Sequence, residues 1–155
     1  MKTINNFYIE KKKVLLRVDL NVPVINGVIT EKSRVTTITS TIKKLIKRKN
    51  KIFLISHFGR PEGKYEKKLS IEFICPILAE EFEKEKIFFN RSFNNQEIQE
   101  TISRMEFGDV CLFENTRFNE GEEKNDLSFA KELAKNFDIY VNDAFSASHR
   151  KHATI

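Results

Sequence analysis

The stretch KIFLISHFGRP, residues 51 to 61, indicates both the fold and the place of the functional site. Its first six residues are nearly all apolar, which is typical of a short strand buried on both faces of a parallel sheet. The stretch then changes abruptly to His57, Gly59, Arg60 and Pro61, which do not continue a buried strand. We therefore expect a strand that ends at a polar edge facing a ligand.

The same pattern recurs on both sides of this stretch. Short apolar runs at 14–18, 87–89, 109–113 and 138–142 predict further strands, and Asn26-Gly27 predicts a hairpin turn. Amphipathic segments between the strands predict four helices. The first has its N-cap at Ser33 and runs to Lys49, and the second covers 72–84 after a cap at Ser70. The third covers 95–104, and the fourth covers 127–137 after a cap at Asp126. Pro76 either kinks or restarts the second helix, and 114–125 is expected to be a polar loop. This alternation predicts an α/β domain of three layers, Rossmann-like, with a mainly parallel sheet.

Composition limits the class of protein. A chain of 155 residues suffices for one domain with a core, and its net charge of +5 favours anionic partners. The N-terminus lacks the apolar region of a signal peptide, and the two cysteines have no metal-like spacing, so we expect a soluble protein of the reducing cytoplasm. The sequence contains no GxGxxG, GxxxxGK[ST] or HExxH motif, so nothing indicates a nucleotide cradle or a metal site of those kinds.

Polar residues follow each predicted strand at the edge where parallel sheets bind ligands. The successive strands lead into Arg17, Asp19 and Asn21; His57, Gly59 and Arg60; Glu114, Asn115 and Arg117; and Asp143, His149 and Arg150. Arginine recognises phosphate or carboxylate through paired hydrogen bonds, so several converging arginines predict a small, multiply charged anion as ligand. The Asp19/Asn21 pair adds acceptors for a hydroxyl if the chain stays extended. Arg34 and the N-terminus of the first helix could form a further anion-binding site.

Each of these residues also has a simpler explanation. Lysine runs such as 11–13 usually lie on solvated surfaces, and a single arginine after a strand commonly forms a surface ion pair. His57 could be a hydrogen-bonded loop residue, and Asp19 and Asn21 could be turn residues. A stand-alone anion- or nucleic-acid-binding module, and a fragment that folds poorly, therefore stay open as alternatives.

Four motifs carry a resemblance to a known family. LLRVDLNVP (15–23), SHFGRP (56–61), LFENTRF (112–118) and YVNDAFSASHRKHA (140–153) strongly resemble the N-terminal domain of the phosphoglycerate kinase family. GVITEKSRVTTITSTIKKL (27–45) is similar as well, so the resemblance covers nearly the whole chain in order.

The resemblance implies reversible phosphoryl transfer between ATP and 3-phosphoglycerate, giving 1,3-bisphosphoglycerate in glycolysis. The N-terminal domain of the family binds the phosphoglycerate, the C-terminal domain binds the magnesium nucleotide, and a hinge closes the two. Arg34 is the implied catalytic residue, acting on the transferring phosphoryl group. The implied substrate-binding residues are Asp19, Leu20, Asn21, Arg34, His57, Phe58, Gly59, Arg60, Arg117 and Arg150.

Two substitutions and the length depart from the family pattern. Thr116 stands where the family usually has an aliphatic residue, and Ser146 where it usually has glycine; a positive φ at Ser146 would strain the loop and displace Arg150. We expect residues 1–155 to be the phosphoglycerate-binding domain of a truncated chain, with the sheet incomplete at its C-terminus. Mg2+ and ATP or ADP would then bind to a domain absent here, and this chain alone would be inactive. It is expected to be a cytoplasmic monomer that binds 3-phosphoglycerate or 1,3-bisphosphoglycerate, without nucleic acid or membrane partners.

Overall fold

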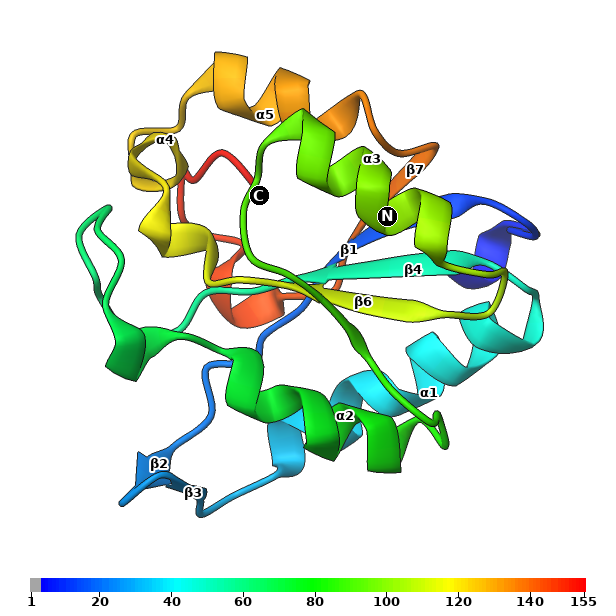
Figure 1. The fold of residues 1–155 in the computed structure, drawn as a ribbon, viewed down its shortest axis with the longest axis horizontal. Coiled ribbons are helices and arrows are strands. Elements are labelled where there is room, and N and C mark those ends of the chain that lie inside the picture. The colour runs from blue at the N-terminus through cyan, green and yellow to red at the C-terminus, as the bar shows by residue number, and fades with distance from the viewer. Residues whose placement is uncertain (1–3) are drawn as a thin grey trace.

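The computed structural model describes residues 4–155, which form a five-stranded sheet covered by helices on both faces (Figure 1). Helices of the 3-10 type are labelled η. The elements in chain order are η1 (Ile4–Asn6), β1 (Lys13–Arg17), β2 (Val24–Ile25), β3 (Val28–Ile29), α1 (Ser33–Lys47), β4 (Lys51–Ile55), η2 (Lys67–Leu69), η3 (Glu72–Ile74), α2 (Cys75–Glu81), β5 (Phe88–Asn90), α3 (Asn95–Arg104), β6 (Val110–Phe113), η4 (Thr116–Phe118), α4 (Glu120–Glu123), α5 (Leu127–Ala134), β7 (Ile139–Asn142) and η5 (Phe145–Ala147).

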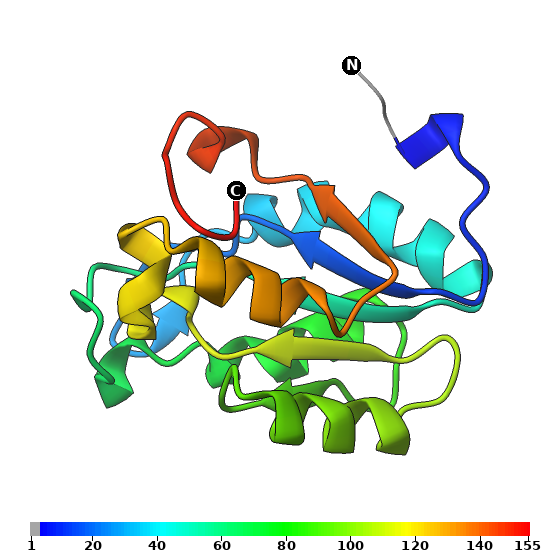
Figure 2. The ribbon, with the colours of Figure 1, turned by 90° about the horizontal axis from the view of Figure 1, so that it is seen from above.

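The five strands are all parallel, in the order β5-β6-β4-β1-β7. Arg17 at the end of β1 pairs with Ile55 at the end of β4 and with Asn142 at the end of β7. The strands therefore end at one side of the sheet, which we call the carboxyl edge (Figure 2). This confirms the predicted α/β class. The β2–β3 hairpin turns at Asn26-Gly27, both at positive φ, as the sequence predicts.

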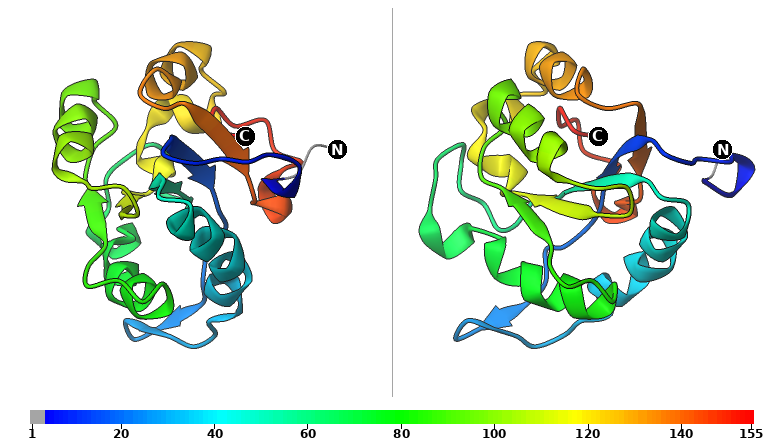
Figure 3. Two further views of the ribbon diagram at one scale, coloured as in Figure 1. Left: turned by 90° about the vertical axis from the view of Figure 1, so that its right-hand side faces the viewer. Right: turned by 45° about the vertical axis from the view of Figure 1, so that its right-hand side comes forward.

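The sheet is buried on both faces, which explains its nearly continuous apolar strands. Helices α1 and α2 cover one face and α3 and α5 the other (Figure 3). Alternate residues of one strand serve the two cores: Val14 and Leu16 pack on the α1 side, and Leu15 on the α5 side.

Two predicted caps are wrong. Helix α1 begins at Ser33, which follows the N-cap position instead of occupying it, and no side chain caps this helix. The Glu31 carboxylate accepts a hydrogen bond from the Ser33 N–H at 2.8 Å instead. Ser70 is not an N-cap residue either, because Ile71 holds that position before η3; the Ser70 hydroxyl donates to the Glu114 carboxylate at 2.7 Å and accepts from the Glu72 N–H at 3.4 Å.

Pro76 restarts the chain as a new helix, which settles one open alternative. The segment 72–84 is the short η3 followed by α2, with the proline in the first turn of α2, where its missing N–H is not needed. The expected polar loop 114–125 contains η4 and α4. The Asp126 cap is confirmed, since its carboxylate accepts from the Ser128 N–H at 2.7 Å. Within residues 4–155, no helix is long and apolar enough to cross a membrane.

Candidate functional site at the carboxyl edge

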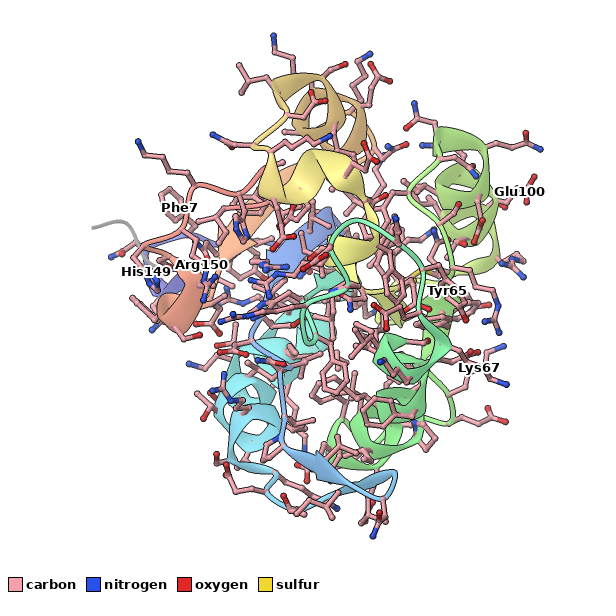
Figure 4. The ribbon with its side chains drawn as sticks, turned by 90° about the vertical axis from the view of Figure 1, so that its left-hand side faces the viewer. Phe7, Tyr65, Lys67, Glu100, His149 and Arg150 are labelled. Carbon is pink, nitrogen blue, oxygen red and sulfur yellow. The ribbon has the colours of Figure 1, made fainter. Side chains whose placement is uncertain are left out.

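Four basic side chains from three strand ends share the carboxyl edge. His57 and Arg60 follow β4, Arg117 follows β6, and Arg150 follows β7. The charge of Arg150 acts on both His57 and Arg117, and the charge of Arg60 acts on Arg117. We call these four residues the anion cluster. Figure 4 views this edge, with Arg150 and His149 on one side of it and Tyr65 and Lys67 on the other.

His57 and Arg117 form a buried floor to the cluster. Their exposed fractions are 7% and 3%. One guanidinium nitrogen of Arg117, Nη1, donates to the Gly59 carbonyl at 2.6 Å, and its Nε lies 3.4 Å from the Glu123 carboxylate. Arg60 and Arg150, by contrast, are exposed. The cluster thus combines two fixed cationic or donor groups with two solvent-facing arginines.

The fully buried Asn115 locks the loops after β4 and β6 together. Its amide oxygen accepts from the Phe58 and Arg117 N–H groups, both at 3.1 Å. Its amide nitrogen donates to the Phe58 carbonyl at 2.6 Å and to the Leu69 carbonyl at 2.9 Å. These four bonds use the whole hydrogen-bonding capacity of the side chain, so the relative position of His57 and Arg117 is set before a ligand arrives.

Gly59 allows the tight path of the loop between His57 and Arg60. Its φ is +59°, and a Cβ at this position would lie 2.7 Å from Cδ2 of Leu69. Its N–H donates to the Asn21 side-chain oxygen at 3.1 Å, which joins the ends of β1 and β4. Another residue here would suffer both backbone strain and a clash.

Asp19 lies beside the cluster and is already engaged. Its carboxylate accepts from the Arg34 guanidinium, from the Ser146 hydroxyl and, at 3.1 Å, from the Asn21 N–H. Partial burial works to raise the pKa of Asp19, but the hydrogen bonds from Ser146, Asn21 and Arg34 outweigh it, so the pKa lies below its ordinary value. Asp19 and Asn21 therefore form a turn rather than an extended pair of free acceptors, and Arg34 has a protein partner.

Ser146 has no strained backbone. It lies in η5 and is not among the non-glycine residues of positive φ. The condition under which it would displace Arg150 is therefore not met, and the Arg150 N–H donates to the Ala147 carbonyl at 2.9 Å. The serine instead contributes a hydroxyl that binds Asp19.

Two residues that the resemblance places in the site turn their side chains into the core. Leu20 is fully buried and Phe58 is 9% exposed, both packed in the core on the α1 side. Leu20 instead helps to hold the strand ends together through its backbone, because its N–H donates to the Ser56 hydroxyl at 2.9 Å.

Burial and neighbouring charge keep His57 neutral. Burial, followed by the positive charges of Arg17 and Arg117, lowers the pKa of His57 to about 3. Burial also lowers the pKa of Arg117, while the nearby Glu123 carboxylate raises it. At neutral pH His57 is therefore an uncharged group among arginines, suited to hydrogen bonding with an anion rather than to charge attraction.

Sequence reasoning noted Arg17 after the first strand but gave it no role. The structure shows its side chain fully buried, bonded to His57 and to Thr116 and 3.9 Å from the buried Glu122 carboxylate. Glu122 was missed altogether. An arginine within the apolar run VLLRV was the available signal, because a buried guanidinium requires buried partners. Nothing comparable in the sequence marked Glu122.

An apolar cavity of about 390 Å³ lies elsewhere, between β7, α5 and the C-terminal segment. Leu133, Phe137 and Ile155 are among its lining residues, and no member of the anion cluster is. Because the sequence predicts a multiply charged ligand, which requires charged partners, the anion cluster is the better candidate for the functional site.

Comparison with known proteins gives one consistent match. The family model described as phosphoglycerate kinase matches residues 4–155. A phosphoglycerate kinase of Allorhizobium ampelinum is 46% identical over 143 residues, which cover 92% of this chain and 36% of that protein. One from Agrobacterium fabrum is 45% identical over 154 residues, covering 99% of this chain and 38% of that protein.

Solved structures agree with the sequence comparison. Phosphoglycerate kinase from Coxiella burnetii superposes with a TM-score of 0.85 and 35% identity, over 97% of this chain and 37% of that chain. The enzyme from Pyrococcus horikoshii gives a TM-score of 0.86 and 29% identity, over 98% of this chain and 38% of that chain. The chain thus spans well under half the length of these relatives.

Proposed function

Since the chain belongs to the phosphoglycerate kinase family, we propose that residues 1–155 form its 3-phosphoglycerate-binding domain and bind this substrate at the anion cluster. The observation that supports this most is the convergence of His57, Arg60, Arg117 and Arg150 at one edge of the sheet. A phosphate group offers several acceptor oxygens and a double negative charge, which match one neutral donor and three guanidinium groups.

The other site residues fit the opposite end of the substrate. In this proposal, Asp19 and Asn21 bind the hydroxyl and carboxylate end, and Arg34 contacts the phosphoryl group that 1,3-bisphosphoglycerate carries there. Arg34 is bound to Asp19 in the structure. Substrate binding must therefore draw Arg34 from Asp19 toward the phosphoryl group, where its charge stabilises the transition state.

No residue of the site needs to act as a general base. The carboxylate of 3-phosphoglycerate is already ionised at neutral pH, so it attacks without losing a proton. The contribution of this domain is to position the substrate and to stabilise negative charge. The neutral state of His57 agrees with this role, because a group with a pKa of about 3 does not exchange protons near pH 7.

The family also implies Mg2+ with ATP or ADP. Among residues 4–155, no group of three or more His, Cys, Asp or Glu side chains could hold a metal ion. The Asp19 carboxylate beside the cluster is already occupied by three donors, and the Glu123 carboxylate lies 3.4 Å from Nε of Arg117. These residues do not fit a magnesium nucleotide, so we derive no step through one and propose that residues 1–155 alone do not turn over ATP.

Titration of 3-phosphoglycerate into the chain, followed by calorimetry, tests the proposal. Arg60→Ala should weaken binding by about 10- to 100-fold, the effect of one charge-assisted hydrogen bond. Arg104→Ala is the matched control, because Arg104 is exposed at the end of α3, outside the anion cluster. Arg104→Ala should bind as the unchanged chain does.

Four outcomes would contradict the proposal. Absence of 3-phosphoglycerate binding, or equal losses in Arg60→Ala and Arg104→Ala, would remove the anion cluster as the substrate site. Tighter binding of an oligonucleotide than of 3-phosphoglycerate, with affinity falling steeply in salt, would favour a nucleic-acid module instead. ATP-dependent turnover by residues 1–155 in a coupled assay would disprove the proposed lack of activity.

A further inference from the structure

Arg17 is the largest fully buried side chain of the domain, and the proposed binding of substrate does not use it. It ends β1, where every other position from Val14 onward is apolar and buried. One of its terminal nitrogens, Nη1, donates to the Thr116 hydroxyl at 3.2 Å, and the other, Nη2, lies 3.2 Å from Nδ1 of His57. With an exposed fraction of 0%, Arg17 acts on a ligand only through other residues.

The bond between Arg17 and His57 determines which ring nitrogen carries the proton. A guanidinium has only N–H donors, so Nδ1 of His57 must accept with its lone pair. In a neutral imidazole the other nitrogen, Nε2, then holds the hydrogen. Among residues 4–155, Nε2 has no protein hydrogen-bond partner, so its N–H is available to a ligand.

The other tautomer would be unfavourable on both sides of the ring. An Nδ1–H group would face the N–H of Arg17 without an acceptor, in a buried place where an unpaired donor costs about 1–3 kcal/mol. It would also present the lone pair of Nε2 to an anionic ligand. A protonated ring would place a second positive charge 3.2 Å from Arg17.

Glu122 is the buried counter-charge of Arg17 and lies near the same nitrogen, Nη2, that contacts His57. Its fully buried carboxylate lies 3.9 Å from Nη2 of Arg17. It also accepts from the Thr154 N–H at 3.1 Å and from the Thr154 hydroxyl at 2.6 Å, which fix its orientation. Burial lowers the pKa of Arg17, and the charge of Glu122 opposes that shift. Arg17 thus keeps the charged, donor-only form that the bond to His57 requires.

We propose that Arg17, backed by Glu122, is a positioning residue that holds His57 as the neutral Nε2–H tautomer, so that the ring donates a hydrogen bond to the bound anion. Thr116 accepts a hydrogen bond from the other terminal nitrogen, Nη1, which does not contact His57, so Thr116 is not part of the pair that sets the tautomer. The identity of the anion as 3-phosphoglycerate rests on the proposed function, whereas the tautomer is a property of the free domain. The charged groups that act on His57 are Arg17 from β1, Asp19 after it, Arg117 from η4 and Arg150 after η5.

NMR of the chain labelled with 15N in histidine reads the tautomer directly, without ligand, between pH 5 and 8. We expect His57 to show the pattern of a neutral Nε2–H ring that does not titrate in this range. An Arg17→Met/Glu122→Gln variant removes both buried charges together, which avoids leaving either unpaired. The ring of this variant should show a mixture of tautomers, and the variant should bind 3-phosphoglycerate about tenfold more weakly.

Two further variants separate positioning from general disruption. Arg17→Lys keeps a donor-only cation and should retain the Nε2–H pattern. Thr116→Val removes the other 3.2 Å hydrogen bond of Arg17 and should also leave the spectrum of His57 unchanged. An equal change in Thr116→Val and in the double variant would overturn the proposal.

The NMR spectrum of the unchanged chain tests the tautomer of His57 even where the double variant fails to fold. An Nδ1–H ring, or a protonated ring at pH 7, would overturn the proposal at once. An Nε2–H ring in a chain that does not bind 3-phosphoglycerate would support the positioning role and contradict only the proposed substrate.

Discussion

The anion cluster receives side chains from two kinds of strand. The central strands β4 and β6 supply some of them, the edge strand β7 supplies another, and the two kinds of strand hold them differently. Strand β6 is buried at every position and flanked by β5 and β4, and the loop after it holds Arg117 at 3% exposure. Strand β7 has a neighbour on one side only, its Tyr140 is 46% exposed, and Arg150 beyond it is exposed.

This difference separates what folding provides from what a ligand must provide. At the central strands, the buried hydrogen bonds of Asn115 fix His57 and Arg117 during folding, so binding loses little additional side-chain entropy there. At the edge strand, the exposed Arg150 side chain must lose rotamer freedom when it binds an anion, which reduces its net contribution to affinity. A rigid floor with a less ordered rim is the expected result.

The largest expected effect comes from Asn115, after β6. Asn115→Ala leaves four backbone groups, three of them in buried bonds, without partners and should lower the free energy of unfolding by about 3–5 kcal/mol, measured by urea denaturation.

Asn142→Ala is the matched control at the end of β7. Asn142 is exposed and makes two bonds, to the Ala144 N–H and to the Ser148 hydroxyl, so its loss should cost less than about 1 kcal/mol. Equal losses in the two variants would abolish the distinction between central and edge strands.

A second, smaller effect concerns acid stability. The pKa of His57 is lowered to about 3 in the folded state, so between pH 6.5 and 3 the unfolded chain binds a proton that the folded chain does not. Stability contributed by neutral His57 is therefore present above pH 6.5 and lost on acidification, by up to about 3 kcal/mol between pH 7 and 4.

Thermal unfolding across this pH range measures the effect. His57→Gln keeps an acceptor for Arg17 and should reduce the loss of stability in acid. His149→Gln, at an exposed position after β7, should follow the pH dependence of the unchanged chain. An unchanged acid slope in His57→Gln would show that the ring is not held neutral.

The smallest effect is expected at the rim. Ser146→Gly removes the hydroxyl that binds Asp19. Because Ser146 is exposed and its backbone is unstrained, stability should fall by no more than about 1 kcal/mol, and 3-phosphoglycerate affinity should change by only a few-fold. Calorimetry measures both, and a tenfold loss of affinity would assign the rim a structural role as strong as that of the floor.

The strands and the polar groups after them could be predicted from sequence. Each continuous apolar run and the polar residues that end it are local features of the sequence. The caps at Ser33 and Ser70 could not be predicted, because other side chains take part: Glu31, two positions earlier, binds the Ser33 N–H, and Glu114, 44 positions away, binds the Ser70 hydroxyl. Likewise, the sequence shows that Arg34 and Asp19 are polar, but only the fold shows that they bind each other. The buried pair of Arg17 and Glu122 depends on tertiary packing that no local pattern records.

The parallel pairing of β1 with β7 has a consequence for the order in which the domain forms. Lys13 N–H binds the Asp138 carboxylate across 125 positions of sequence at 2.8 Å. During synthesis β1, β4 and β6 are made before β7, so the side of β1 that pairs with β7 stays unpaired until β7 has been made. The Glu122 carboxylate likewise lacks its hydrogen bond from the Thr154 hydroxyl until Thr154 has been made. Arg150 follows β7 in the chain, so a ligand that needs the complete anion cluster can stabilise a nascent chain only after β7 and Arg150 have been made.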